Sequence, residues 1–351
     1  MRILNEHNRG SQYVQDERMV NMRKKSLYSL LSLLIAIGLL VSGCGQAQPA
    51  ATNATPPAAT NSTPTPTPAE DSSKATKDAV LSYFNNIPVV ADSYKIAEAK
   101  LKEELEKTPD KYVVFDVRKA DAYAKGHIKG AINVPFGADI SANLEKMRAA
   151  AKGKTAIVAC YTGQTAGQTD SLLNIAGINT KSLNFGMGMD GFEKGWMALK
   201  YPVVTDPTPM PDAPAVESPN KNIDQAVKDY FTNMGKDSYK IDLPELKDAI
   251  AKTPDQYLIV DVRQKKDFDA GHIKGAINVP YGADLAKNFD TLKEKAKGKT
   301  MVVYCYTGQT AGQSDSALNL AGIKTRSLNF GFGTDNFSKG WKVSFPNDIE
   351  K

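Results

Sequence analysis

The chain contains two copies of one sequence, and this duplication constrains its fold more than any other feature. A shift of 145 residues superimposes residues 111–196 on residues 256–341 without a gap, at about 60% identity. Each copy is far longer than the repeating unit of a solenoid protein, which indicates a duplicated domain. We therefore predict two domains of the same fold, at residues 75–204 and 222–351.

The composition is that of a globular protein. Hydrophobic residues make up 41% of the 351 residues and charged residues 24%, which excludes pervasive disorder, a collagen-like chain and a multi-span membrane protein. The net charge is +5, but six basic and three acidic residues lie in the first 43 positions, so about +2 belongs to the rest. That remainder has no basic stripe, and we expect no nucleic acid partner. With three cysteines and three histidines, we expect neither a disulfide scaffold nor a bound metal.

Residues 1–43 are typical of an export signal. A basic stretch at residues 22–25 precedes an apolar run at residues 27–41, which is shorter than the roughly 20 residues needed to span a bilayer. Residues 1–21 precede a signal that is already complete without them. We therefore expect translation to begin at Met22 or at Met19.

The signal region ends in small residues followed by Cys44. This arrangement resembles the lipobox of bacterial lipoproteins, in which the signal is cleaved before the cysteine and the cysteine sulfur receives a diacylglycerol. The resemblance implies an exported protein that is lipid-anchored through Cys44. Its place would be the outer face of the cytoplasmic membrane, or the outer membrane if the cell has two. An uncleaved anchor or a chance cysteine is the alternative.

Two segments have the composition of linkers. Residues 44–74 are rich in Ala, Thr and Pro and have almost nothing to bury, so we expect a flexible, disordered tether behind the lipidated cysteine. Residues 205–221 are rich in Pro and separate the two globular stretches.

Apolar runs within the first copy predict buried strands. Residues 112–115 form one such run, and residues 155–159 form another that leads directly into Cys160. A helix with a leucine-rich buried side should follow and end at Gly177, before a short strand near residues 181–183. Strands that alternate with helices predict an α/β fold, a mostly parallel sheet flanked by helices. The cysteine then lies at the carboxyl edge of the sheet, where ligands bind in such folds.

The loop that begins at this cysteine is where chemistry is possible. Residues 160–166 and residues 305–311 are identical, and each loop has a glycine at its middle. Such a loop can turn successive backbone N–H groups inward, which forms an anion-binding nest that the following helix dipole strengthens. We expect this environment to lower the pKa of Cys160 and Cys305 and to keep both thiols accessible as nucleophilic thiolates. The alternative is a small buried cysteine at a strand end.

Four motifs in order give the chain a specific resemblance. Residues 116–118 read Asp-Val-Arg, residues 126–135 read Gly-His-Ile-Lys-Gly-Ala-Ile-Asn-Val-Pro, and the Cys-x-x-Gly loop and a Gly-Trp pair follow. All four recur in the second copy. Together they resemble the rhodanese domain, and the resemblance covers both globular regions. It implies two tandem rhodanese-like domains.

The resemblance also implies an enzyme, a rhodanese-type sulfurtransferase. Members of that family take a sulfane sulfur from thiosulfate or a related donor, hold it as a persulfide on the loop cysteine, and pass it to cyanide or a thiol. Cys160 and Cys305 would be the nucleophiles, and no cofactor is implied. We expect a monomer whose partners are these small molecules and the membrane. The implied substrate cradle consists of Tyr161, Thr162, Gly163, Gln164 and Thr165 in the first copy and Tyr306, Thr307, Gly308, Gln309 and Thr310 in the second.

The loops depart from the family in one respect. Many rhodanese loops carry an arginine or lysine that helps to hold thiosulfate, whereas here Thr165 and Thr310 stand where an arginine is frequent. We therefore expect weak affinity for thiosulfate, or a different donor. Related phosphatases and arsenate reductases need an arginine at the sixth residue after the cysteine. Here that residue is Ala166 or Ala311, which argues against phosphatase chemistry.

The other polar and aromatic residues of the motifs are expected to support the fold. The acid–base pairs should order turns past a strand end; they are Asp116 with Arg118 and Asp261 with Arg263. His127 and His272 should have structural roles in turns, and Trp196 and Trp341 should be core residues. Residues 184–186 read as a turn that could lie beside the cysteine loop, and Tyr161 and Tyr306 could form the mouth of its pocket.

Three functions remain open at this level. The first is the sulfurtransferase, favoured because a single thiol per domain is a liability in an oxidising compartment unless it is used. The second is a carrier of sulfane sulfur, or a partner-binding module, without turnover, favoured by the missing cation. The third is a thiol redox sensor whose cysteines become sulfenic acids or mixed disulfides.

Overall fold

The computed structural model of the chain describes residues 68–87, 90–189, 192–335 and 338–351. The predicted signal, Cys44 and most of the predicted tether lie outside these residues. None of the helices within these ranges is both long and apolar enough to cross a membrane. Helix α2 (Pro68–Asn86) begins inside the segment predicted as a tether, so the end of that segment is helical.

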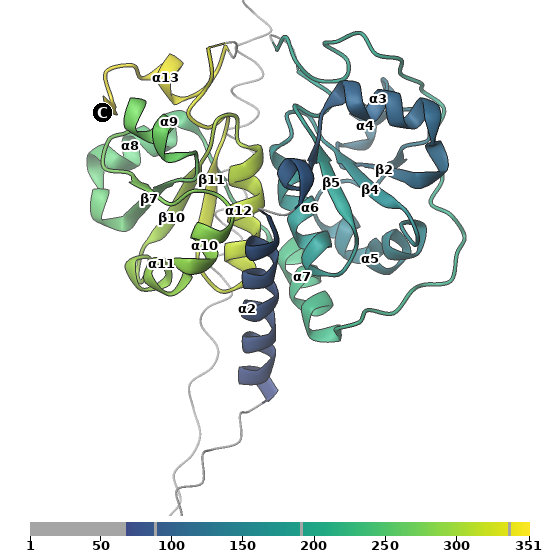
Figure 1. Ribbon diagram of the computed structural model, residues 1–351, viewed down its shortest axis with the longest axis horizontal. Helices are drawn as coiled ribbons and strands as arrows, with labels where there is room; N and C mark the ends of the chain where they lie inside the picture. The colour runs from purple at the N-terminus through teal and green to yellow at the C-terminus, as the bar shows by residue number, and fades with distance from the viewer. Residues whose placement is uncertain (1–67, 88–89, 190–191, 336–337) are drawn as a thin grey trace, which may run out of the picture. The chain divides into compact units, whose positions relative to one another are not determined.

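The first repeat is built on a five-stranded parallel sheet (Figure 1). The strand order is β1-β5-β4-β2-β3. The strands are β1 (Lys95–Ile96), β2 (Tyr112–Asp116), β3 (Ile132–Asn133), β4 (Thr155–Ala159) and β5 (Thr180–Leu183). The helices are α3 (Glu98–Lys107), α4 (Ala120–Ala124), α5 (Ala138–Ala150) and α6 (Gln164–Ile175), with short 3-10 turns at Ala91–Tyr94 and Pro109–Lys111. Both predicted apolar runs are central strands, and α6 stops before Gly177, as the sequence predicts.

The second repeat has the same topology, with the parallel order β6-β11-β10-β7-β9. Its main strands are β6 (Lys240–Ile241), β7 (Tyr257–Asp261), β9 (Ile277–Asn278), β10 (Thr300–Tyr304) and β11 (Thr325–Leu328). A separate antiparallel pair joins β8 (His272–Ile273) to β12 (Ile349–Glu350). The helices are α7 (Lys221–Asn233), α8 (Leu243–Lys252), α9 (Lys265–Ala270), α10 (Ala283–Lys287), α11 (Phe289–Lys295), α12 (Gln309–Leu320) and α13 (Trp341–Ser344), with a 3-10 turn at Pro254–Gln256. The predicted α/β class is therefore confirmed.

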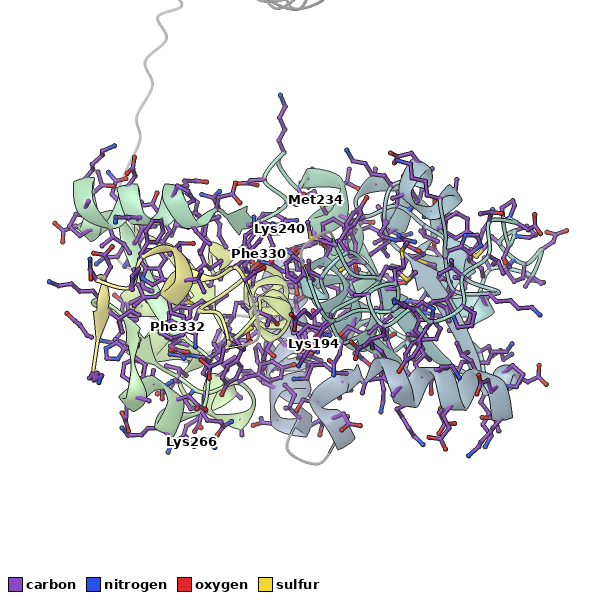
Figure 2. All side chains as sticks on the ribbon, turned by 90° about the horizontal axis from the view of Figure 1, so that it is seen from above. Lys194, Met234, Lys240, Lys266, Phe330 and Phe332 are labelled. Atoms are coloured by element: carbon purple, nitrogen blue, oxygen red, sulfur yellow. The ribbon has the colours of Figure 1, made fainter. Side chains whose placement is uncertain are left out.

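The two repeats belong to one compact unit and meet along helices α6 and α12. Seen from above, Lys240 and Phe330 of the second repeat lie in the middle of the molecule, where the two ribbons meet (Figure 2). The ring of Phe330 lies 6.1 Å from that of Phe192 in the first repeat. The domain boundaries given above stay a prediction.

The helices that precede each sheet pack on the opposite repeat. Helix α2 contacts α10, and α7 contacts α5. The hydroxyl oxygens of Tyr83 and Tyr281 lie 2.9 Å apart, and the ring of Phe84 packs edge-on against Tyr281. Phe136 and Phe231 form the matching edge-on pair on the other side.

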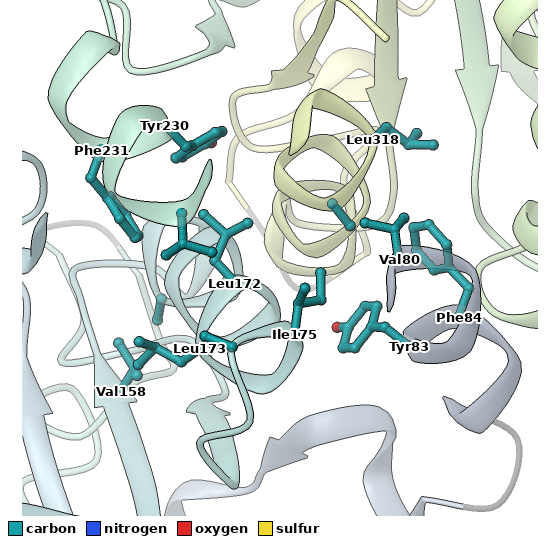
Figure 3. Close-up of a cluster of buried hydrophobic side chains, with 14 of the residues drawn as sticks. Val80, Tyr83, Phe84, Val158, Leu172, Leu173, Ile175, Tyr230, Phe231 and Leu318 are labelled. Carbon is teal, nitrogen blue, oxygen red and sulfur yellow. The ribbon is translucent and has the colours of Figure 1, made fainter. Parts of the chain in front are cut away.

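An apolar core shared by both repeats results from this exchange, beside a separate cluster within each repeat. It contains buried side chains of both repeats, and Figure 3 shows Val80 and Phe84 of α2 near Leu318 of α12, with Leu172 and Leu173 of α6 close by. Burial of such side chains contributes about 1.5–3 kcal/mol each, so the exchanged helices account for a large part of the stability.

The segment predicted as a linker, residues 205–221, is held against the first repeat. Tyr123 accepts a hydrogen bond at its hydroxyl from the backbone N–H of Thr208, at 3.0 Å. Arg148 donates to the backbone oxygen of Val216 at 3.3 Å. The segment therefore connects the repeats as an ordered strap within the described residues.

Candidate functional site

Each cysteine lies between a central strand and the amino end of a helix. Cys160 follows β4 and precedes α6, and Cys305 follows β10 and precedes α12. The helices begin after Gly163 and Gly308, whose φ angles are +96° and +101°. Only glycine adopts this left-handed conformation without strain, so the middle of each loop requires it.

The loop amides point at the sulfur atoms. The N–H group of Gly163 donates to Sγ of Cys160 at 3.1 Å, and that of Gly308 to Sγ of Cys305 at 3.2 Å. Backbone N–H groups of Thr162 and Ala166 also act on Cys160 and lower its pKa. The structure therefore brings the predicted amide nest around the sulfur.

Both thiols are nevertheless buried. Cys160 is 1% exposed and Cys305 2%, and both belong to the apolar core that the two repeats share. Burial raises the pKa of Cys160, because the lost solvation of the thiolate outweighs the loop amides and the charge of Lys240, which lower it. The expectation of an accessible Cys160 thiolate with a lowered pKa is therefore wrong for this conformation.

The glutamines of the predicted cradle reach across to the other repeat. Gln164 donates through Nε2 to the hydroxyl of Ser327 at 2.9 Å, and Gln309 donates to that of Ser182 at the same distance. Their carboxamides bind the opposite sheet instead of facing the thiol of their own loop. Sequence reasoning could not separate these two roles, since both need a polar side chain at the loop.

The threonines of the loops are partly buried, and one of them contacts a cation. Thr310 accepts a hydrogen bond at Oγ1 from the ammonium of Lys95, at 3.4 Å. Lys95 lies in the other repeat. The backbone oxygen of Thr165 accepts from the hydroxyl of Thr169 within α6. Thr162 and Thr307 are half-buried.

The tyrosines that follow the cysteines lie at the surface, 38% exposed for Tyr161 and 36% for Tyr306. Tyr306 donates its hydroxyl to Asp267 at 2.5 Å and lines a cavity of about 730 Å³ with Arg263 and Phe332. Burial and this hydrogen bond raise the pKa of Tyr306 to about 12. Cys305 is not among the residues that line the cavity, so Tyr306 does not open a path to the thiol in this conformation.

The acid–base pairs hold the backbone beside the loops. Asp116 accepts from the N–H, Nε and Nη2 groups of Arg118 at 3.0, 3.0 and 2.6 Å, and Nη2 also donates to the oxygen of Gly126. Asp261 and Arg263 repeat this geometry in the second domain. The four side chains are buried, and their contacts are those of turn-ordering ion pairs.

The histidines are structural groups. The ring nitrogens of His127 bond the backbone oxygens of Tyr123 and Asp206, at 2.9 and 3.1 Å, and the ring stacks on Tyr123. His272 bonds the oxygen of Phe268 at 3.1 Å. Neither ring takes the place of a base beside a thiol. The tryptophans, Trp196 and Trp341, are core residues as predicted.

A second turn supports each cysteine loop. The N–H of Met187 donates to the backbone oxygen of Cys160 at 2.7 Å, and the N–H of Gly188 donates to that of Tyr161 at 2.9 Å. A side chain at Gly186 would overlap the Cys160 oxygen, which explains the glycine in the Asn-Phe-Gly turn. The predicted position of this turn beside the loop is confirmed.

The feature that sequence reasoning missed is the contact between the two loops. Helices α6 and α12 approach so closely at Gly167 and Gly312 that a Cβ at Gly312 would lie 2.5 Å from the oxygen of Gln164. The hydroxyls of Ser171 and Ser316 lie 2.6 Å apart further along. Both cysteine loops therefore lie at the same end of one helix pair. The glycine and serine at equal positions in both copies are the available sequence signal.

Buried acids and amides complete this interface. Gln168 donates to Asp315 at 2.9 Å, and Gln313 donates to Asp170 at 2.8 Å. Burial raises the pKa of Asp170 and Asp315 well above the usual range. Among the described residues, no cluster of three or more His, Cys, Asp or Glu side chains could hold a metal ion.

The sequence model of the rhodanese-like domain matches residues 97–194 and 242–334. The chain therefore belongs to the rhodanese-like domain family and contains two such domains in tandem. No curated protein matches the chain.

Solved structures give distant similarities. A thiosulfate sulfurtransferase from Pseudomonas aeruginosa is 21% identical with a TM-score of 0.31; the match covers 77% of this chain and 48% of that one, about half its length. A rhodanese-related protein from Thermoplasma volcanium is 28% identical with a TM-score of 0.26, over 32% of this chain and 98% of that one. A protein from Lactobacillus plantarum is 29% identical with a TM-score of 0.26, over 32% and 89%.

Proposed function

We propose that the protein is a sulfurtransferase in which Cys160 and Cys305 each carry a sulfane sulfur as a persulfide. The observation that carries this proposal is the loop amide at each sulfur, with N–H donors at 3.1 and 3.2 Å. A preorganised amide stabilises the thiolate and then the persulfide anion without a metal or a general base. Membership of the rhodanese-like family supports the same chemistry.

The reaction has two displacement steps. The thiol releases its proton to solvent, and the thiolate attacks the outer sulfur of thiosulfate. The sulfur–sulfur bond of thiosulfate breaks, sulfite leaves with the bonding electron pair, and a persulfide anion remains on the cysteine. Cyanide or an acceptor thiolate then attacks the outer sulfur of the persulfide. The bond between the two sulfur atoms breaks and the cysteine leaves as a thiolate. The product is thiocyanate when cyanide attacks and a new persulfide when a thiolate attacks.

The burial of both thiols favours a second candidate, a sulfane-sulfur carrier with little turnover. At 1% and 2% exposure, neither sulfur is open to an acceptor until the surrounding side chains move. A carrier would load one sulfur per cysteine and release it slowly, whereas an enzyme would release thiocyanate continuously from thiosulfate and cyanide.

We also propose that the chain is exported and anchored to a membrane by a lipid on Cys44. The support is the order of basic stretch, short apolar run and small residues before that cysteine. The sulfur-transfer chemistry would then take place outside the cytoplasm, where small sulfane donors reach it directly.

Sulfur loading tests the roles of the two cysteines. The wild type should gain two sulfur atoms per chain from thiosulfate, measured by intact mass, and cyanide should remove both. Cys160→Ser and Cys305→Ser should each gain one, because each loop loads independently. The double variant should gain none, and loading that persists there would refute the catalytic assignment.

The loading of Cys160 should depend on pH in a defined direction. Because burial raises its pKa, the thiolate fraction stays small at neutral pH and grows above the ordinary thiol value of about 8.5. In Cys305→Ser, the rate of loading should therefore keep rising beyond pH 9. A rate that levels off below pH 8 would show that the thiolate already predominates there.

A further inference from the structure

The cysteine loops contain no positive side chain of their own. Residues 160–166 and 305–311 both read Cys-Tyr-Thr-Gly-Gln-Thr-Ala. A donor such as thiosulfate carries two negative charges, and a thiolate adds a third in the encounter. Backbone dipoles alone leave most of this repulsion uncompensated, so a cation near each loop would decide which donors can bind.

The second loop receives a cation from the first repeat. Lys95 lies in β1, and its ammonium is 3.4 Å from Oγ1 of Thr310, in the first turn of α12. Lys95 is paired in the sheet with Ser182, and the hydroxyl of Ser182 accepts the hydrogen bond of Gln309. The edge of the first sheet therefore lies directly against the loop of Cys305.

The first loop has the equivalent lysine of the second repeat near it, although within the described residues no hydrogen bond like that of Lys95 with Thr310 joins this lysine to the loop. Lys240 is the equivalent of Lys95 in the second repeat, is paired in β6–β11 with Ser327, and lies where the repeats meet (Figure 2). Ser327 accepts the hydrogen bond of Gln164, which is four residues after Cys160. The positive charge of Lys240 acts on the Cys160 thiol and opposes the effect of burial on its pKa.

Within the part of the chain that the structure describes, neither Lys95 nor Lys240 forms an ion pair, and both side chains are only partly buried. The acids that interact with them electrostatically are Asp170 and Asp315, respectively. Both carboxyls accept hydrogen bonds from amide groups, Asp170 from Gln313 at 2.8 Å and Asp315 from Gln168 at 2.9 Å. The lysine charges therefore remain available to an anion.

We propose that each repeat supplies the cation that binds the anionic donor in the other repeat: Lys95 at Cys305 and Lys240 at Cys160. This inference rests on the proposed sulfurtransferase function and specifies its substrate class, small anionic sulfane donors of the thiosulfate kind. The lysines are specificity-determining residues that act across the interface. The missing loop cation is thereby replaced from outside the loop.

Competing alkylation tests the lysines without relying on sulfur transfer. A thiolate attacks both iodoacetate and iodoacetamide, but only iodoacetate is an anion. The ratio of the iodoacetate rate to the iodoacetamide rate therefore cancels differences in thiolate population and access. Peptide mapping of the full chain resolves each cysteine separately. We expect Lys95→Met to lower the ratio about tenfold at Cys305 and to leave it unchanged at Cys160. Lys240→Met should do the reverse.

Charge-conserving variants and thiosulfate complete the test. Lys95→Arg and Lys240→Arg should restore the ratio, and the rate of loading by thiosulfate should follow the same crossed pattern. Unchanged ratios, or equal losses at both cysteines in each lysine variant, would overturn the inference. If the wild type takes no sulfur from thiosulfate, the proposed function fails, while the alkylation ratio still decides the role of the lysines.

Discussion

Replacing Arg148 by methionine should destabilise the protein by about 3–5 kcal/mol, because it leaves a buried carboxylate without its partner. Arg148 in α5 contacts Asp224 in α7 at 2.5 Å, and both side chains are 7% exposed. The second oxygen of Asp224 has no hydrogen-bond partner. Urea unfolding of the variant and the wild type measures the difference.

The duplication offers a matched control for this experiment. Lys77 in α2 and Asp290 in α11 form an ion pair at 2.6 Å in the corresponding contact, but their side chains are 32% and 79% exposed. Lys77→Met should therefore cost at most about 1 kcal/mol. The double variant Arg148→Met, Asp224→Leu should recover part of the lost stability. A loss no larger than that of Lys77→Met would contradict the expectation for Arg148.

Replacing Gly167 or Gly312 by alanine should lower stability by about 2–3 kcal/mol, and more when both are changed. A new Cβ would overlap the backbone oxygen of Gln309 or Gln164, which belongs to the other helix and cannot rotate away. The helices α6 and α12 would have to separate, and the hydrogen bond between Ser171 and Ser316 would lengthen.

The sign of this effect separates it from helix propensity. In an isolated helix the same change would stabilise by about 1 kcal/mol, since alanine favours the helix more than glycine does. If the thermal unfolding midpoint of the variant equals or exceeds that of the wild type, helices α6 and α12 do not approach each other at Gly167 as closely as described above. Because the cysteine loops lie at the same ends of these helices, sulfur loading should fall together with stability.

Local signals were sufficient for the elements around each site. The apolar runs predicted β2 and β4 correctly, because a parallel strand covered on both faces needs such a run. Gly177 correctly predicted the end of α6. The amide donor from Gly163 followed from the loop glycine alone. These features depend on residues close together in the sequence.

The surroundings of the thiols could not be predicted in this way. Helix α6 buries Gln168, Asp170 and Ser171 although they are polar, since their partners are the equivalent residues of the other repeat. The expected pKa of Cys160 was wrong because burial in the core that the two repeats share outweighs the loop amides. No pattern within one copy contains this information.

The sequence could not predict which repeat α2 and α7 pack against. Both copies present nearly the same apolar surface, so the sequence of α2 is compatible with its own sheet and with the other one. The chain reaches α7 through the strap that Arg148 holds at Val216, a contact that no local pattern predicts.

The exchange of α2 and α7 also determines the order in which the chain can reach its final state. The first sheet ends at Leu183, but α7, which covers part of its repeat, ends only at Asn233. The first repeat can therefore be completed only after α7 has been synthesised, and α2 reaches its final contacts only after the second sheet has formed. Cleavage between the two repeats before they join would leave an exposed apolar surface on each fragment. We therefore expect neither fragment to fold stably without the other.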